Sequence, residues 1–188
     1  YGGARFVDLA YANAWGGPSE EVREVLARTV RDARSLDLQY TPYAGNRIAR
    51  RVTADLLSAT SGQTFSLRDV AITAGAMGAL YLTFASFEPG EVAMPAPTWM
   101  DHPLYAARAG HTPVLVPNLP NLRLDFDAIE QALTDRTRAF VLTQPGNPCG
   151  HTHSAAELAT LPSLLRPRGL WPARDASPPA PPTAHPAL

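Results

Sequence analysis

The sequence predicts an α/β fold with three layers, in which a mostly parallel sheet is flanked by helices. Two observations support this prediction. From residue 68 onward, short apolar runs typical of strands alternate with longer patterns typical of helices. Two of these helices begin with an acidic or hydroxyl residue followed, at capping-box spacing, by a glutamate. Such alternation implies right-handed βαβ units, whose strands lie parallel in one sheet.

Two amphipathic helices are expected before the alternation begins. Residues 20–35 place valine and leucine on one face, and Ser19 is a suitable N-cap. Residues 46–60 form the second helix, with Gly62 just beyond its end. Glycine adopts the left-handed conformation that ends many helices at little cost.

The alternating part of the chain contains four expected strands and four expected helices. The strands are residues 69–73, 92–96, 112–118 and 138–144. The helices are residues 75–87, 97–110, 127–133 and 154–161. Asp127 with Glu130, and Ser154 with Glu157, form the capping boxes that start the last two helices.

The composition divides the chain into three parts. Residues 1–35 form an N-terminal segment with its helix, residues 36–175 form the α/β domain, and residues 176–188 form a tail. The tail is rich in proline and alanine without apolar periodicity, which predicts disorder. Pro162 stands where the last helix would continue, at a cost of roughly 3 kcal/mol.

Charge and cysteine content exclude several classes of protein. The formal net charge is −1, so neither nucleic acid nor an anionic membrane is an expected partner. No apolar run approaches the ~18 residues of a membrane span, and no secretory signal is evident. The single cysteine, Cys149, excludes an internal disulfide and fits a reducing compartment. We therefore expect a cytoplasmic protein.

Three features at strand ends point to a ligand, because open parallel sheets bind ligands at the carboxyl ends of their strands. Residues 72–80 (ITAGAMGAL) read as a strand, a glycine turn and a helix start, which suits an anion or phosphate. Trp99 follows the next strand and offers a flat face for a planar ring, or is a core residue. Asn147, between two prolines, offers a hydrogen-bond donor and an acceptor, or belongs to a structural turn.

Two histidines follow this turn. His151 and His153 flank Thr152, but no cluster of cysteine or acidic residues completes a metal site in the sequence. Both are interpreted as loop histidines, and no metal is expected.

The motifs YTPYAGNRIARR (40–51), ITAGAMGALYL (72–82), VAMPAPTW (92–99), LDFDAIEQALTDRTRAFVLTQPGNPCG (124–150) and SAAEL (154–158) occur in this order. The ordered set resembles the class I/II pyridoxal-phosphate-dependent aminotransferases of fold type I. The resemblance runs from about residue 6 to about residue 175 and covers only the N-terminal portion of a family member. It identifies residues 36–175 as part of the family's pyridoxal-phosphate-binding large domain.

The resemblance implies roles for particular residues in binding pyridoxal 5'-phosphate. Gly75, Ala76 and Met77 correspond to the turn whose backbone amides bind the cofactor phosphate. Trp99 corresponds to the aromatic residue stacked on the pyridine ring. Asn147 corresponds to the asparagine that hydrogen-bonds the phenolic oxygen.

Further roles implied by the resemblance lie elsewhere in the chain. Tyr40 corresponds to a tyrosine that reaches the phosphate of the neighbouring subunit, so a homodimer is expected. Ala12 stands where many members have a glycine near the substrate carboxylate. Asp175 is the candidate for the acid beside the pyridine nitrogen, although Pro172 interrupts the strand that this acid should end.

A complete family member transfers an amino group between an amino acid and a 2-oxo acid. Its mechanism needs a lysine that bonds the cofactor covalently, and all 16 basic residues of this chain are arginines. We therefore expect non-covalent cofactor binding at most, and no turnover by this chain alone. The alternatives are a non-catalytic remnant or partner of an intact homologue, or a relative with other pyridoxal-phosphate chemistry. A frame shift, a truncated gene or an incomplete record would each produce this pattern.

Overall fold

The computed structural model describes residues 17–170 and 172–176. The chain divides into two compact units, Tyr1–Pro42 and Tyr43–Leu188. Ala12 and the tail from residue 177 onward lie outside the described residues.

The first unit contains α1 (Glu20–Arg31) and the 3-10 helix η1 (Ser35–Leu38). The Ser19 side chain accepts a hydrogen bond from the backbone N–H of Val22, which confirms the predicted N-cap. Helix α1 ends at Arg31 rather than at the predicted residue 35, and η1 begins at Ser35.

The second unit contains all of the sheet. Its helices are α2 (Arg47–Ser61), η2 (Leu67–Asp69), α3 (Gly75–Ala85), α4 (Asp101–Arg108), α5 (Phe126–Ala132), α6 (Ala155–Leu165) and η3 (Arg166–Arg168). Its strands are β1 (Glu91–Ala96), β2 (Thr112–Pro117), β3 (Thr137–Gln144) and β4 (Pro172–Ala176). Gly62 ends α2 with a φ of 70°, as predicted.

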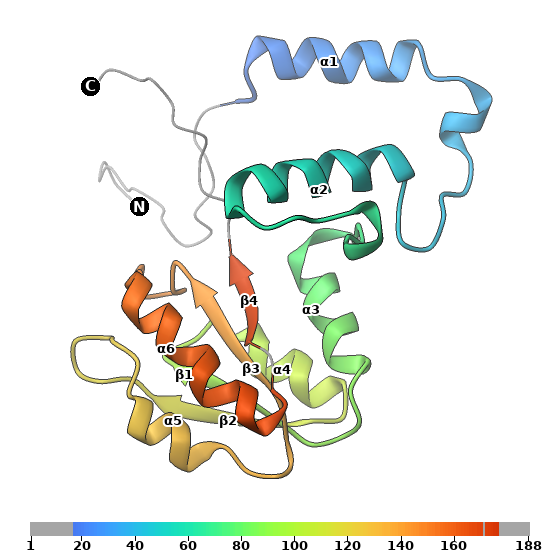
Figure 1. The fold of residues 1–188 in the computed structure, drawn as a ribbon. Helices are drawn as coiled ribbons and strands as arrows, with labels where there is room; N and C mark the ends of the chain where they lie inside the picture. Colours follow the sequence, from blue (N-terminus) through green and yellow to red (C-terminus); the bar gives the residue numbers. More distant parts are fainter. Residues whose placement is uncertain (1–16, 171, 177–188) are drawn as a thin grey trace, which may run out of the picture. The chain divides into compact units, whose positions relative to one another are not determined.

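The four strands form one sheet in the order β2-β1-β3-β4, and every neighbouring pair is parallel (Figure 1). In the register, Val92 of β1 lies opposite Ala139 of β3, and Thr143 of β3 lies opposite Asp175 of β4. The carboxyl ends of β1, β3 and β4 therefore lie along one edge of the sheet.

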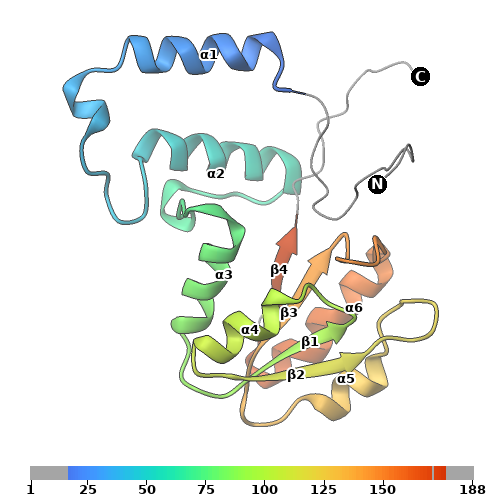
Figure 2. The same cartoon turned by 180° about the vertical axis from the view of Figure 1, so that it is seen from behind.

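Helices cover both faces of the sheet, so the prediction of three layers is confirmed (Figures 1 and 2). On one face, Phe140 and Leu142 of β3 pack with Leu161 and Leu165 of α6 and with Ile129 of α5. On the opposite face, strand residues pack with the buried residues Leu80 and Phe84 of α3 and Ala106 of α4. Alternate residues of β3 thus serve two separate cores.

The predicted strand over residues 69–73 is wrong. Its backbone groups find partners outside the sheet: Ile72 N–H donates to the carbonyl of Ala44, and Arg50 Nε donates to the carbonyl of Val70. Residues Leu67–Asp69 form a 3-10 helix instead. Apolar residues alone do not make a strand without a strand neighbour to pair with.

The predicted capping box of Asp127 and Glu130 is also wrong. The N-cap of α5 is Asp125, whose side chain accepts a hydrogen bond from the N–H of Ala128 at 3.0 Å. Glu130 instead pairs with Arg168 at 3.2 Å on the surface. Two aspartates in one helix start compete for the cap, and the one with extended backbone takes it.

Helix α6 does not end at Pro162 but continues through it to Leu165. An interior proline costs about 3 kcal/mol, whereas full burial of a leucine stabilises by about 1.5–3 kcal/mol. Leu161 and Leu165, on either side of Pro162, are both buried in the core. Their burial offsets the cost of the proline. Pro172 likewise opens β4 rather than interrupting it, as proline can at the start of an edge strand.

Replacing Ser154 by alanine is expected to lower the free energy of unfolding by about 1 kcal/mol. The predicted capping box is confirmed here, since Ser154 Oγ accepts from Glu157 N–H at 3.3 Å and Glu157 Oε2 accepts from Ser154 N–H at 3.0 Å. Urea unfolding measures the change. Ser163→Ala, on the exposed side of the same helix, is the control, and equal effects of both substitutions would contradict the cap.

Candidate functional site

The sheet reverses its direction of growth between β1 and β3. From β1 the chain passes through α4 to β2 on one side, and from β2 it passes through α5 to β3 on the other side of β1. The connection after β1 leads to β2 and the connection after β3 leads through α6 to β4, so the two leave in opposite directions, and open α/β sheets bind ligands in the crevice between such connections.

Three of the predicted residues follow or lie near the carboxyl ends of neighbouring strands. Trp99 is half-buried and follows β1, and Asn147 is exposed and follows β3. Asp175 is the penultimate residue of β4, opposite Thr143 near the end of β3. Thr98 and Asn147 line one small cavity of about 20 Å³.

The start of α3 leaves its backbone amides available to an anion. Gly75 has a φ of 82°, and its N–H donates to the carbonyl of Thr73. No side chain caps the helix. Ala76 is exposed and Met77 is half-buried in the first turn. Uncapped N–H groups and the helix dipole together favour a negatively charged group at this position.

His102 is a site residue that the sequence analysis did not identify. Its ring is fully buried on α4, with Nε2 3.2 Å from Asp175 Oδ2 and Nδ1 3.1 Å from Thr98 Oγ1. Its position one helical turn after Thr98, beside Trp99, was the available signal. Burial lowers the pKa of His102, while Asp175 and, more weakly, Asp101 raise it. The ring is therefore neutral near pH 7 and donates from Nε2 to the carboxylate.

Gln144 fixes the loop that carries Asn147. Its buried side chain donates from Nε2 to the carbonyl of His153 at 3.2 Å and accepts from the N–H of His153 at 3.1 Å. Gly146 N–H also donates to the carbonyl of His151 at 2.8 Å. Because both ends of the loop are bonded to each other, Asn147 stands on a closed turn.

Tyr40 lies in the first unit, and its side chain is fully exposed. Tyr40 thus belongs to a different unit from the other predicted cofactor residues. Its predicted reach to a neighbouring subunit stays a prediction.

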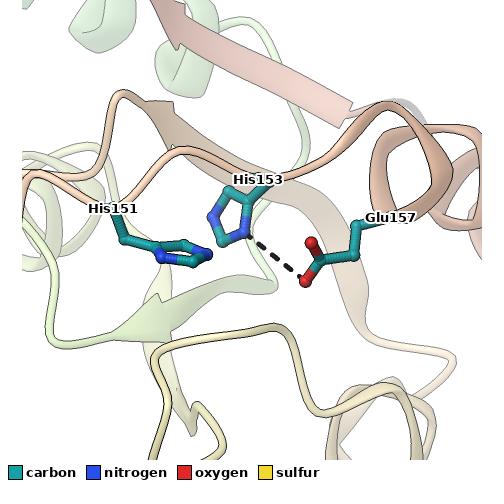
Figure 3. Close-up of side chains that lie close together, drawn as sticks. All are labelled: His151, His153 and Glu157. Carbon is teal, nitrogen blue, oxygen red and sulfur yellow. Dashed lines mark ion pairs between the residues drawn. The ribbon is translucent and has the colours of Figure 1, made fainter.

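Glu157 lies beside the two loop histidines, so the expectation that no acidic residue accompanies them is wrong. The ligand atoms of His151, His153 and Glu157 all lie within 4.8 Å of one another. Figure 3 shows the two rings and the carboxylate facing one another, with His153 Nδ1 3.9 Å from Glu157 Oε1. His153 lies just before the N-cap Ser154 and therefore outside α6. The spacing of helical side chains thus did not indicate that His153 lies near Glu157.

Hydrogen bonds hold Glu157 in its charged form. Burial raises the pKa of this carboxyl, but hydrogen bonds from Ser154, from the N–H of Leu124 and from Arg123 outweigh burial and lower the pKa to about 2. Burial and the neighbouring His151 lower the pKa of His153, against a smaller opposing effect of Glu157.

Comparison with known proteins identifies the family. The family model described as aminotransferase class I and II matches residues 5–176 of the 188 residues. The chain therefore belongs to the class I and II aminotransferases.

Individual relatives agree with this assignment. A probable aspartate/prephenate aminotransferase of Aquifex aeolicus is 27% identical over 154 residues, which are 80% of this chain and 38% of the relative. One of Thermus aquaticus is 32% identical, over 76% of this chain and 37% of the relative. This chain thus spans less than half the length of the curated relatives it matches.

Solved structures share the fold. The aspartate aminotransferase of Thermus thermophilus with maleate superposes with a TM-score of 0.78 at 28% identity, over 84% of this chain and 41% of that chain. The aspartate aminotransferase of Thermotoga maritima gives a TM-score of 0.80 at 25% identity, over 86% and 43%. The predicted fold class is confirmed.

The residues present fit the non-covalent part of a pyridoxal phosphate site. The uncapped start of α3 suits a phosphate, and the carboxylate of Asp175, held by a neutral histidine, suits a protonated ring nitrogen. A lysine for a covalent bond does not occur among the 188 residues.

Asp175→Asn is expected to lower the pKa of His102 further below its ordinary value, because Asp175 is the main group that raises it. The pKa is read from an NMR titration of the histidine ring protons. Asp101→Asn is the control and should lower the pKa less, since Asp101 acts only at longer range. A pKa that rises in Asp175→Asn would contradict the contact.

Glu157→Gln is expected to destabilise the fold most at neutral pH. The folded pKa of about 2 lies below the ordinary 4.5, so the charged form stabilises the fold above pH 4.5. This contribution declines as the pH falls from 4.5 and is lost below about 2. Denaturant unfolding at several pH values should therefore show a difference between wild type and variant that shrinks on acidification. Glu130→Gln, in an exposed ion pair, should show little effect at any pH.

Proposed function

We propose that this chain forms the cofactor-binding part of a pyridoxal-phosphate-dependent aminotransferase and binds pyridoxal 5'-phosphate without a covalent bond. The observation that carries the proposal is the position of Trp99, Asn147 and Asp175, which follow or end three neighbouring parallel strands at one edge of the sheet. The family membership of the chain supports it.

Each residue has a distinct task in this proposal. The amides at Ala76 and Met77 bind the phosphate at the start of α3, and Gly75, whose own N–H donates to the carbonyl of Thr73, forms the turn before them. The indole of Trp99 stacks on the ring, and the amide of Asn147 donates to the phenolic oxygen. When bound, the cofactor supplies an electron sink for amino-group transfer. Asp175 accepts the proton of the ring nitrogen.

His102 is a positioning residue in this arrangement. Its neutral ring donates from Nε2 to Asp175 Oδ2 and leaves Oδ1 without a hydrogen-bond partner among the described residues. Its other nitrogen, Nδ1, lies within hydrogen-bond distance of Thr98. Because an ionised carboxylate can only accept, Asp175 fixes the tautomer with the proton on Nε2, and its other oxygen stays available to the ligand.

The complete enzyme would move an amino group between an amino acid and a 2-oxo acid in the cytoplasm, as a homodimer. Aspartate is the first donor to test, since relatives carry the name aspartate aminotransferase. In this dimer Tyr40, fully exposed in the first unit, would be donated to the neighbouring subunit.

A second candidate function is that of a non-catalytic partner of an intact homologue. The absence of lysine from the chain favours it, because an arginine is not a practical nucleophile in place of lysine. Co-purification with a full-length relative supports this candidate, whereas a monodisperse monomer in the presence of that relative contradicts it.

Titration of the purified 188-residue chain with pyridoxal 5'-phosphate, followed by its absorption spectrum, is expected to show saturable binding. Asn147→Ala should weaken binding about tenfold or more, as expected for a lost hydrogen bond to a charged group worth about 1.5–3 kcal/mol. Gln131→Ala, exposed on α5, is the control.

No turnover is expected with aspartate or a panel of other amino acids. Absence of binding, or multiple turnover, would each overturn the proposal.

A further inference from the structure

We propose that His151, His153 and Glu157 form a binding site for a divalent transition metal ion of the Zn²⁺ type, next to the loop that carries Asn147. The site lies where the loop after β3 enters α6 (Figure 3). Two imidazoles and one carboxylate are a donor set that binds zinc in proteins, with a further position open to water.

The two rings carry nitrogen atoms that lack partners. His151 Nε2 and His153 Nδ1 are buried and form no hydrogen bond with the described residues. His153 is only 7% exposed. A buried polar atom without a partner is costly, so two such atoms that face one carboxylate indicate a missing group between them.

The other oxygen of Glu157 and the backbone of His153 already have hydrogen-bond partners. Glu157 Oε2 accepts from the N–H and the hydroxyl of Ser154, which leaves Oε1 directed to the histidines. The backbone of His153 is bonded to Gln144. The backbone is thus fixed, and the side chains are free to adjust to an ion.

The separations allow one ion to reach all three groups. Ligand atoms on one zinc ion lie at most about 4 Å apart, since each bond is about 2.0–2.2 Å long. The observed limit of 4.8 Å therefore requires side-chain shifts on the order of 1 Å, which rotation about the side-chain bonds supplies. His151 and His153 also line the cavity of about 20 Å³, which has room for one particle of the size of a water molecule or an ion.

Arg123 is the group that an ion must displace. Its Nε lies 3.4 Å from Glu157 Oε1, and its side chain is 55% exposed. Because its own side chain is largely exposed, Arg123 can turn into solvent, and a bound cation would replace its positive charge beside the buried Glu157. The N–H of Leu124, 3.3 Å from the same oxygen, can remain as a second partner.

The site uses none of the proposed cofactor residues, although Asn147 lines the same small cavity as His151 and His153. Helix α6, which carries Glu157, covers the face of the sheet opposite to α4, which carries His102. A bound ion would instead join the loop that carries Asn147 to the start of α6. We infer a structural role, in which the ion holds this loop against the helix.

The test is titration of the untagged 188-residue chain with ZnCl₂ by isothermal titration calorimetry, with thermal unfolding measured in parallel. One ion per chain is expected to bind at micromolar concentration or below and to raise the unfolding temperature. MgCl₂ should have no effect, because Mg²⁺ prefers oxygen ligands. CoCl₂ should give visible absorption bands of bound Co²⁺.

Variants decide the ligand set. His151→Ala, at a half-buried loop position, is expected to fold and to lose at least tenfold in affinity, and His153→Ala should do the same where circular dichroism shows a folded chain. Thr152→Ala, an exposed residue between them, should bind as the wild type. Unchanged affinity in His151→Ala, or no saturable Zn²⁺ binding by the wild type, would overturn the proposal. So would loss of binding in Cys149→Ser alone, since that result would assign the ion to the thiolate.

Discussion

The parallel pairing of β1 with β3 is the constraint on which the rest of the structure depends. These two central strands are consecutive in space but not in sequence, because β2 lies between them in the chain. Their pairing forces the connections after β1 and β3 to leave in different directions and opens the crevice between them. Trp99 and Asn147, far apart in the sequence, become neighbours of one crevice for this reason.

Buried polar side chains turn this geometry into a fixed arrangement. Gln144 closes the loop after β3, Glu157 caps α6, and His102 holds Asp175 across the carboxyl edge of the sheet. Gln144 and Glu157 satisfy backbone groups of the loop and of the helix start, and His102 donates to the partly exposed carboxylate of Asp175. The precision of the site therefore depends on residues that do not touch the ligand in the proposed function.

Local signals in the sequence predicted local structure well. Ser19, Gly62 and the pair Ser154 and Glu157 mark the helix ends as predicted, because a cap involves only near neighbours in the chain. One local prediction failed, because Asp125 rather than Asp127 caps α5, and the other failures involve distant partners. The segment 69–73 lacks a neighbouring strand, and the contact of His102 with Asp175 joins residues 73 positions apart. No periodicity encodes such contacts, so His102 and the approach of Glu157 to the histidines needed the folded chain.

The β4 strand has β3 as its single neighbour among the described residues, so its outer edge carries N–H and C=O groups without ladder partners. An edge of this kind accepts a strand from another chain through backbone hydrogen bonds. Pro172 has no N–H to donate at the start of β4, so an added strand would pair mainly along Ala173–Ala176. Self-association of this chain by strand addition would therefore extend the sheet beyond β4, on the side away from β3.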